Sequence, residues 1–155
     1  AAAFDMKVLV WGRETSIARA KADGLDTTAS LPEVFGCDVV SAMLRLNPET
    51  RGLIKYEHLA AMKKDALFVN VSRAELVEPG ALERALGEGR PGHAALDVFM
   101  DEPWFGEVPA WVRGPNVTAT PHLGFVAKEN YEKYFGDAFE AINAFAAGKP
   151  VRVVA

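Results

Sequence analysis

Three charged residues of types that could handle a small acid follow three separate apolar runs of the sequence. Arg73 comes after one run, Glu102 after the next and His122 after the last. A guanidinium binds a carboxylate through two parallel hydrogen bonds, and an imidazole exchanges a proton near neutral pH. A carboxylate beside that imidazole stabilises its charged form and raises its pKa. Each residue alone is also common as a solvated loop charge, so the pattern indicates acid chemistry without proving it.

The apolar runs predict the strands that carry these residues. Short β-rich segments are expected as buried strands at residues 7–11, 37–44, 66–71, 94–99 and 116–120. Helices are expected at residues 16–24, 56–64, 79–87 and 127–147, with a brief one starting in a capping-box sequence at Ser30. Alternation of this kind predicts an α/β fold with a parallel sheet covered on both faces. Ligands of such sheets bind at the carboxyl ends of the strands.

One glycine motif has the right letters in the wrong place. The hexapeptide GEGRPG at residues 87–92 matches G-x-G-x-x-G. A dinucleotide loop must follow a strand and open a helix, whereas this motif follows a predicted helix and precedes a predicted strand. We therefore predict a helix stop and turn at this position.

Composition excludes several classes of protein. The chain has 155 residues and a net charge of −4, with Lys and Arg dispersed along it, which argues against a nucleic-acid partner. No apolar run approaches the ~20 residues that cross a bilayer, and a single cysteine, Cys37, cannot form an internal disulfide. No cluster of His, Cys, Asp or Glu has the spacing of metal ligands. We expect a cytoplasmic protein without a metal or a membrane partner.

Four sequence blocks carry a resemblance to a known family. They are CDVVSAMLRLNPETRGLI, MKKDALFVNVSRAELVEPGALERAL, ALDVFMDEP and NVTATPHLG. In this order and spacing they resemble the nucleotide-binding domain of the D-isomer-specific 2-hydroxyacid dehydrogenases. The resemblance implies a doubly wound, Rossmann-like parallel sheet. Residues 1–125 would form part of the nucleotide-binding domain, and residues 126–155 a helix and tail that return toward a substrate domain.

The resemblance also implies roles for single residues. Arg73 would bind the carboxylate and carbonyl of a 2-oxo acid, and His122 would give a proton to the carbonyl oxygen. Glu102 would pair with His122, while hydride passes between the substrate and a nicotinamide cofactor. Asp97 would face the nicotinamide amide. The cofactor-binding positions implied in this way are Arg13, Leu44, Val71, Ser72, Arg73, Asp97, His122 and Gly124, with Leu123 beside them.

The end of the first expected strand bears on cofactor choice. Members of the family that prefer NAD place an acidic residue at about the position of Gly12, where it binds the ribose diol. Gly12 removes that carboxylate, and Arg13 could pair with a 2′-phosphate. NADP is therefore favoured over NAD, with Glu14 as a counter-argument if it turns inward.

The fingerprint glycine loop and the first strand of the family are absent from the sequence. In the strand order 3-2-1-4-5-6 that strand lies at the centre, so the Rossmann-like sheet is expected to be incomplete. We expect the chain to be a piece of a longer polypeptide that forms a homodimer, and to be inactive alone. The rival interpretations are a non-catalytic nucleotide-sensing or interaction module, an inert fragment, and an oxidation of the formate or phosphite type at the same Arg and His.

Overall fold

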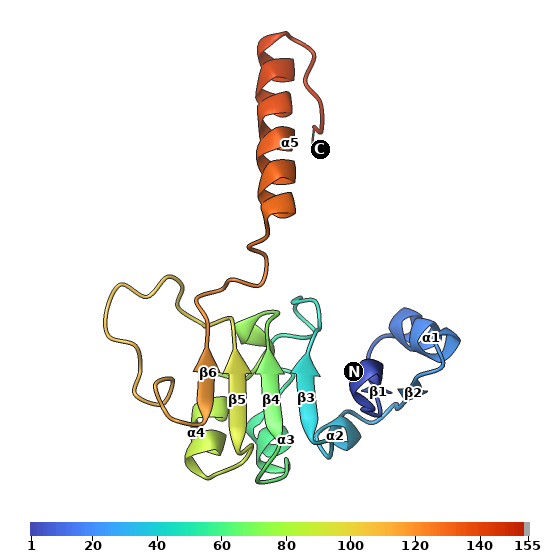
Figure 1. Ribbon diagram of the computed structural model, residues 1–155, viewed down its shortest axis with the longest axis vertical. Coiled ribbons are helices and arrows are strands. Elements are labelled where there is room, and N and C mark those ends of the chain that lie inside the picture. The colour runs from blue at the N-terminus through green and yellow to red at the C-terminus, as the bar shows by residue number, and fades with distance from the viewer. Residues whose placement is uncertain (154–155) are drawn as a thin grey trace. The chain divides into compact units, whose positions relative to one another are not determined.

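The structure is a computed structural model that describes residues 1–153, apart from the side chain of Ala2. The chain divides into two compact units, Ala1–Pro121 and His122–Ala155. Each unit is described by itself. The first holds every strand of the described residues and the second is built around one long helix (Figure 1).

Six short strands form two parallel sheets in the first unit. The strands of the smaller sheet pair in the order β1-β2, and those of the larger sheet in the order β3-β4-β5-β6. This pairing is that of a doubly wound sheet from which one strand between β1 and β3 is left out, so the predicted incomplete Rossmann-like fold is confirmed. The strands are β1 (Leu9–Val10), β2 (Asp26–Thr27), β3 (Val39–Ala42), β4 (Leu67–Asn70), β5 (His93–Leu96) and β6 (Val117–Ala119).

The strands differ from the predicted ones in extent and number. Each predicted strand is present but shorter, because only the residues that face a neighbouring strand form ladder hydrogen bonds. The sequence analysis missed β2, since its two residues, Asp26 and Thr27, are too few and too polar to give an apolar pattern. β5 ends at Leu96 rather than at Phe99, which places Asp97 directly beyond the strand.

The helices of the first unit are short, and several of their boundaries differ from prediction. The helix predicted to reach Lys64 ends at Ala60, because the chain tightens there and the Met62 N–H donates to the Leu59 carbonyl at 3.1 Å. Met62 is thereby fully buried. The helices are η1 (Ala2–Phe4), α1 (Glu14–Ala22), α2 (Leu31–Val34), α3 (Tyr56–Ala60), η2 (Ala74–Leu76) and α4 (Ala81–Gly87).

The capping box expected at Ser30 is wrong. Ser30 is the N-cap of α2, but its side chain makes no capping bond. The hydroxyl of Thr28 takes over: it accepts from the Ser30 N–H at 2.9 Å and donates to the Glu33 carboxylate. A Thr hydroxyl can accept from the backbone N–H two residues ahead, which forms an ST turn. Here the turn of Thr28 replaces the capping bond expected from Ser30.

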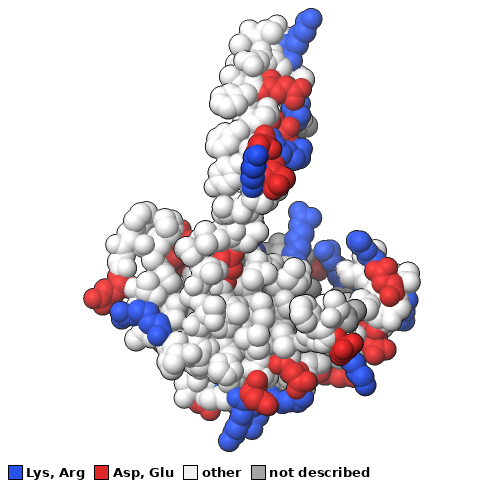
Figure 2. Space-filling view, viewed as in Figure 1, with Lys and Arg blue, Asp and Glu red and all other residues white. Residues whose placement is uncertain are grey.

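The core lies on one face of the larger sheet. Alternate residues of β3, β4 and β5 are buried, with Phe68 fully enclosed, and α3 and α4 contact each other on that side (Figure 1). Val39 on the other face remains 39% exposed, and Leu67, Val69 and Ala95 are only half-buried. Within the first unit, helices therefore cover one face of the larger sheet, whereas the sequence predicts helices on both. In Figure 2 the middle of this unit shows few charged side chains.

The glycine hexapeptide is a turn, as predicted. Gly87 ends α4, and β5 begins at His93, one residue beyond Gly92. A Cβ on Gly92 would lie 1.9 Å from the Lys64 carbonyl oxygen, so backbone meets backbone there. Glycine is needed at this position because two backbone segments cross too closely for a side chain, and not to bind phosphate.

The second unit consists mainly of α5 (Lys128–Ala146), which confirms the predicted terminal helix. It ends as expected at Gly148, whose φ is +70°. Charged side chains gather on one side of α5 in Figure 2, joined by ion pairs such as Lys133–Asp137 at 3.1 Å. The apolar stripe opposite is exposed; it contains Tyr131, Tyr134, Phe135, Phe139, Ile142 and Phe145. No helix within residues 1–153 is both long and apolar enough to cross a bilayer.

Candidate active site

The turn that follows β4 carries Arg73 and is held by a buried amide. Asn70, the last residue of β4, is 2% exposed. Its Nδ2 donates to the Arg73 carbonyl at 2.9 Å, and its Oδ1 accepts from the Ser72 N–H at 3.1 Å. The Arg73 side chain is exposed, and its Nη1 donates to the Ser72 carbonyl at 2.7 Å. The turn is thus tied at three points while the guanidinium stays accessible to a ligand.

Ser72 joins this turn to the end of β3. Its hydroxyl donates to the Leu44 carbonyl at 2.9 Å. Leu44 is partly buried and packs against the core of the first unit. The structure therefore brings three predicted positions, Leu44, Ser72 and Arg73, to the carboxyl ends of two neighbouring strands.

Asp97 lies at the carboxyl end of β5 and is buried. Its side chain accepts a hydrogen bond from the Thr120 hydroxyl, just beyond β6, and its N–H donates to the Asn70 carbonyl at 3.0 Å. A buried carboxylate is costly unless it is hydrogen-bonded, and these contacts lower that cost. Asp97 therefore stands next to β4, at the edge of the sheet where Arg73 lies.

Glu102 lies in the long loop after β5. Its Oε1 accepts from the Phe99 N–H at 2.5 Å, and Phe99 packs on Trp104 with ring centroids 4.6 Å apart. These contacts fold the beginning of the loop back toward the strand. The Glu102 side chain is exposed rather than enclosed by the protein.

A cavity of about 290 Å³ adjoins the Arg73 turn. It lies between the beginning of α4 and the loop after β5, and Asn70 and Ala74 line it on the side of the turn. Its remaining wall is mostly apolar with three carboxylates, and is formed by Val77, Glu78, Pro79, Gly80, Leu82, Glu83, Leu96, Val98, Phe99, Met100, Asp101, Trp104, Pro109 and Trp111.

His122 opens the second unit, together with Leu123 and Gly124. Its φ is +53°, a left-handed conformation that histidine seldom adopts. Its ring meets the Phe125 ring edge to face, with centroids 5.6 Å apart. Asp5 and Arg152 have the same φ, so this conformation by itself does not distinguish His122.

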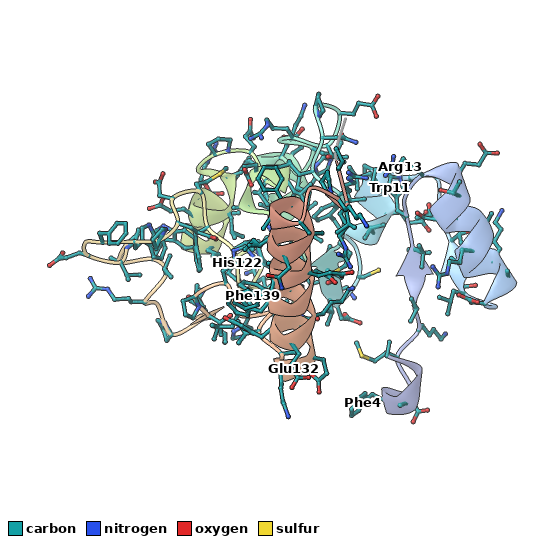
Figure 3. All side chains as sticks on the ribbon, turned by 90° about the horizontal axis from the view of Figure 1, so that it is seen from above. Phe4, Trp11, Arg13, His122, Glu132 and Phe139 are labelled. Carbon is teal, nitrogen blue, oxygen red and sulfur yellow. The ribbon has the colours of Figure 1, made fainter. Side chains whose placement is uncertain are left out.

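Arg13 lies on the turn between β1 and α1, beside Trp11 (Figure 3). It is the N-cap of α1, and its carbonyl accepts from the N–H groups of Ser16 and Ile17. Its side chain is exposed. A Cβ on Gly12 would lie 3.4 Å from the Ser16 Cβ, an ordinary contact, so the turn itself does not demand glycine.

Exposed apolar side chains follow the carboxyl ends of β3, β4 and β5 in the chain. Met43, Val71 and Met100 lie there and are 70%, 45% and 48% exposed. Apolar side chains beside an arginine suit a nicotinamide cofactor, which combines rings with phosphates. In residues 1–153 no three His, Cys, Asp or Glu side chains gather as metal ligands.

The sequence analysis missed two polar residues of this edge, Asn70 and Thr120. Each stands at or just after the end of a strand, where it bonds a predicted site residue or its turn. A signal was available: an amide or hydroxyl at the last position of an apolar run has few uses except to satisfy neighbouring backbone or side-chain groups.

Comparison with known proteins gives one matching family and many relatives. The model of the D-isomer specific 2-hydroxyacid dehydrogenase NAD binding domain matches residues 1–124. The chain is 36% identical over 118 residues to glycerate dehydrogenase of Methylorubrum extorquens, which covers 76% of this chain and 38% of that protein. It is 50% identical to an oxidoreductase of Ralstonia solanacearum with a solved structure (TM-score 0.93), covering 99% of this chain and 45% of that one. The chain thus spans less than half the length of these relatives.

Two solved structures among the matches contain different cofactors. A D-isomer specific 2-hydroxyacid dehydrogenase of Lactobacillus delbrueckii holds NAD; it is 26% identical, with a TM-score of 0.75 over 99% of this chain and 50% of that one. A protein of the same description from Xanthobacter autotrophicus holds NADPH; it is 37% identical, with a TM-score of 0.62 over 84% of this chain and 54% of that one. The solved structures similar to this chain therefore include complexes with both nucleotides.

Proposed function

The chain belongs to the D-isomer specific 2-hydroxyacid dehydrogenase family, and we propose on that premise that it serves the interconversion of a 2-hydroxy acid and a 2-oxo acid. The observation that carries the proposal is the Arg73 turn. An exposed guanidinium stands on a hydrogen-bonded turn at the carboxyl end of β4, an interior strand of the larger sheet. Open α/β sheets bind their ligands at that edge.

Arg73 binds the substrate in this proposal. Its guanidinium offers two parallel N–H donors to a carboxylate, and the remaining donors polarise the adjacent carbonyl. A third contact, from Nη1 to the Ser72 carbonyl, restricts the side chain before the substrate arrives. Restricting the side chain beforehand lowers the entropy lost on binding.

The nicotinamide cofactor, when bound, supplies or accepts the hydride. Leu44, Val71 and Ser72 hold it from the ends of β3 and β4, Asp97 orients its amide from the end of β5, and Gly124 contributes backbone. The exposed apolar side chains Met43, Val71 and Met100 support this assignment, because a bound ring would remove them from water.

His122 moves the proton. As an imidazolium it donates to the oxygen of the 2-oxo acid during reduction, and as a neutral imidazole it accepts the hydroxyl proton during oxidation. Glu102 stabilises the charged form of His122.

Kinetics of the natural polypeptide that carries these residues test the proposal. Small 2-oxo acids that share a carboxylate, such as glyoxylate and hydroxypyruvate, are reduced by NADPH or NADH in the expected outcome. Pyridine nucleotide oxidation at 340 nm is the measurement, with Arg51→Ala as control, because Arg51 is an exposed arginine in a weak ion pair with Glu75. Absence of reduction with every 2-oxo acid tested refutes the proposal.

For the cofactor, we propose NADP over NAD. The support is the turn of Gly12 and Arg13, which lacks an acidic residue at the ribose position and presents an exposed guanidinium. A phosphate there also meets the first N–H groups of α1, since helix N-termini attract anions.

We further propose that the natural polypeptide is a homodimer. Phe105 in the loop after β5 is 95% exposed, and the apolar stripe of α5 is uncovered within the described residues. Trp104 and Trp111 in the same loop are only half-exposed, since Trp104 packs on Phe99 and Trp111 packs against the core. Sedimentation as a monomer at all concentrations would exclude the dimer.

A non-catalytic nucleotide-sensing module is the second candidate, and residues 1–155 expressed alone distinguish it. No strand of the described residues leads through a glycine loop into a helix, and that loop normally holds the pyrophosphate. We therefore expect the chain alone to show no turnover and only weak binding of NADPH or NADH. Micromolar affinity in isothermal titration would favour the sensing module.

A further inference from the structure

We propose that Asn70 is a positioning residue for substrate binding, acting through Arg73. This inference rests on the function proposed above, in which Arg73 binds the carboxylate of the substrate. Asn70 itself is buried and touches no ligand; its amide sets the backbone from which the guanidinium projects.

The geometry is that of a two-point latch. Nδ2 of Asn70 donates to the carbonyl of Arg73 at 2.9 Å, and Oδ1 accepts from the N–H of Ser72 at 3.1 Å. The two bonds fix the peptide group before Ser72 and the peptide group after Arg73, and leave little freedom to the two residues between them. The guanidinium then returns to the Ser72 carbonyl at 2.7 Å, a group whose direction the latch has already determined.

The base of the latch is rigid. The Asn70 backbone belongs to β4, which pairs with β3 on one side and β5 on the other, and its carbonyl accepts from the Asp97 N–H at 3.0 Å. A side chain on such a strand end cannot move without disturbing both ladders. The backbone position of Arg73 is therefore fixed relative to the central strands of the larger sheet.

An amide satisfies both bonds, whereas an ionised carboxylate of the same shape does not. A carboxylate at position 70 keeps the acceptor for the Ser72 N–H but presents a second oxygen to the Arg73 carbonyl, where the native group has a donor. The two oxygens repel each other, and the turn shifts. A protonated carboxyl restores the missing donor, because its O–H can point at the Arg73 carbonyl.

The variant Asn70→Asp is therefore sensitive to pH in a way that wild type is not. Burial raises the pKa of a carboxyl at this position, and so do the carboxylates of Asp97, Glu78, Glu83 and Asp101, which lie beyond β5 or along the adjoining cavity. The Arg73 guanidinium and the Ser72 N–H lower it. The ratio of variant to wild-type kcat/KM cancels the titration of groups that both proteins share.

The experiment is a double-mutant cycle in the natural polypeptide, with a 2-oxo acid as substrate. Asn70→Asp is expected to lower kcat/KM between about 10- and 100-fold at pH 8, since a misplacement of 1 Å costs up to that much. The ratio of variant to wild type rises as the pH falls toward 5.5. In an Arg73→Ala background the same change at position 70 costs less than about threefold, because the group it positions is gone.

A matched control exists in Asn47→Asp. Oδ1 of Asn47 accepts from the N–H groups of Glu49 and Thr50 at 2.9 Å, in a turn outside the proposed site. Asp keeps these acceptor bonds, so kcat/KM stays at the wild-type value at every pH. Amide hydrogen exchange gives a second readout: Asn70→Ala speeds exchange of the Ser72 N–H at least tenfold, whereas Asn47→Asp leaves it unchanged.

The outcomes separate the two claims. If Arg73→Ala leaves kcat/KM intact, the proposed function is wrong. If Arg73→Ala abolishes activity while Asn70→Asp costs the same factor in both backgrounds, or costs nothing, the inference about Asn70 is wrong and the proposed function stands. A ratio that does not change between pH 8 and pH 5.5 also overturns the inference.

Discussion

The ends of β4 and β1 carry the same local arrangement in two different settings. Each strand is followed, three residues beyond its last one, by an exposed arginine: Arg73 after Asn70 and Arg13 after Val10. β4 pairs on both sides in the larger sheet, and a buried amide holds its turn. β1 has two residues and one neighbour, and the backbone bonds at the start of α1 are what hold its turn.

The difference teaches what each arginine can be used for. The turn of Arg73 is held by the core, which suits a catalytic step that requires a fixed position of the guanidinium, because small displacements slow the chemistry. A guanidinium on a half-exposed turn suits selection between similar ligands, because the turn can change without loss of the fold. Tolerance of change is typical of surface loops that determine specificity.

The largest expected difference between β4 and β1 is in how much each strand contributes to the free energy of unfolding. Phe68→Ala empties a fully enclosed position of β4 and should lower the free energy of unfolding by about 3–5 kcal/mol. Val10→Ala in half-buried β1 should cost about 0.5–2 kcal/mol, near the average for point mutations. Urea denaturation followed by fluorescence measures both. Equal losses would show that the two sheets are supported alike.

Activity gives the next effect. Arg73→Ala and His122→Ala in the natural polypeptide should each lower kcat/KM by at least ~10², the low end for a lost proton donor or charge-stabilising group. Steady-state kinetics with a 2-oxo acid measures the loss, and Arg13→Ala tested with saturating NADH serves as the control from the other turn. Wild-type kinetics for His122→Ala would remove the assignment of the proton donor.

Cofactor preference tests the β1 turn. A charge-assisted pair between Arg13 and a 2′-phosphate contributes roughly 1.5–3 kcal/mol, or about a ten- to hundredfold preference for NADPH. Gly12→Asp combined with Arg13→Ala should reverse that preference, measured as the ratio of kcat/KM for the two nucleotides. A tenfold preference for NADH in the unmutated protein would mean that Arg13 does not bind phosphate.

The proposed pairing of Glu102 with His122 is tested by Glu102→Gln in the natural polypeptide. This change should lower kcat/KM for reduction of a 2-oxo acid by less than His122→Ala does, because the proton donor is kept and only its proposed counter-charge is lost. An unchanged kcat/KM would separate Glu102 from His122, and Glu107→Gln in the same loop is the matched control.

The smallest effect concerns the outer layer that covers β4. The Tyr56 hydroxyl donates to Glu88 and Arg84 lies over the Tyr56 ring, which together tie α3 to α4. The hydrogen bond from Tyr56, followed by that from Arg84, holds the pKa of Glu88 below its ordinary 4.5. A lowered pKa stabilises the fold above pH 4.5, and this contribution is lost as the pH falls through the lowered value.

Tyr56→Phe removes only the hydroxyl and keeps the ring beneath Arg84. The free energy of unfolding should fall slightly at pH 7, and the difference from wild type should vanish in acid. Urea denaturation at a series of pH values measures it. A difference that persists at pH 2 would show that ring packing, rather than the carboxylate, is affected.

Sequence reasoning determined the alternation of elements, the parallel sheet and the family. Apolar runs such as ALFVNV are long enough to mark a strand, and the blocks around Arg73 and His122 are specific in order and spacing. The same reasoning distinguished the glycine hexapeptide from a dinucleotide loop, since its neighbours in the chain were visible. Local pattern was sufficient for these features, but not for the bonds of Thr28 at the start of α2 or of Asn70 to its turn, because a short polar side chain has several partners within reach.

Other features depended on contacts between residues distant in the chain. The two residues of β2 form a strand only because they pair with β1. The order of strands and helices along the sequence also does not show which face of the larger sheet is buried. The bond from Ser72 to Leu44 and the pairing of Thr120 with Asp97 were likewise decided by the tertiary structure. The physical reason is that an amide or hydroxyl has several possible partners in a sequence, and only the packed sheet determines which one lies within hydrogen-bonding distance.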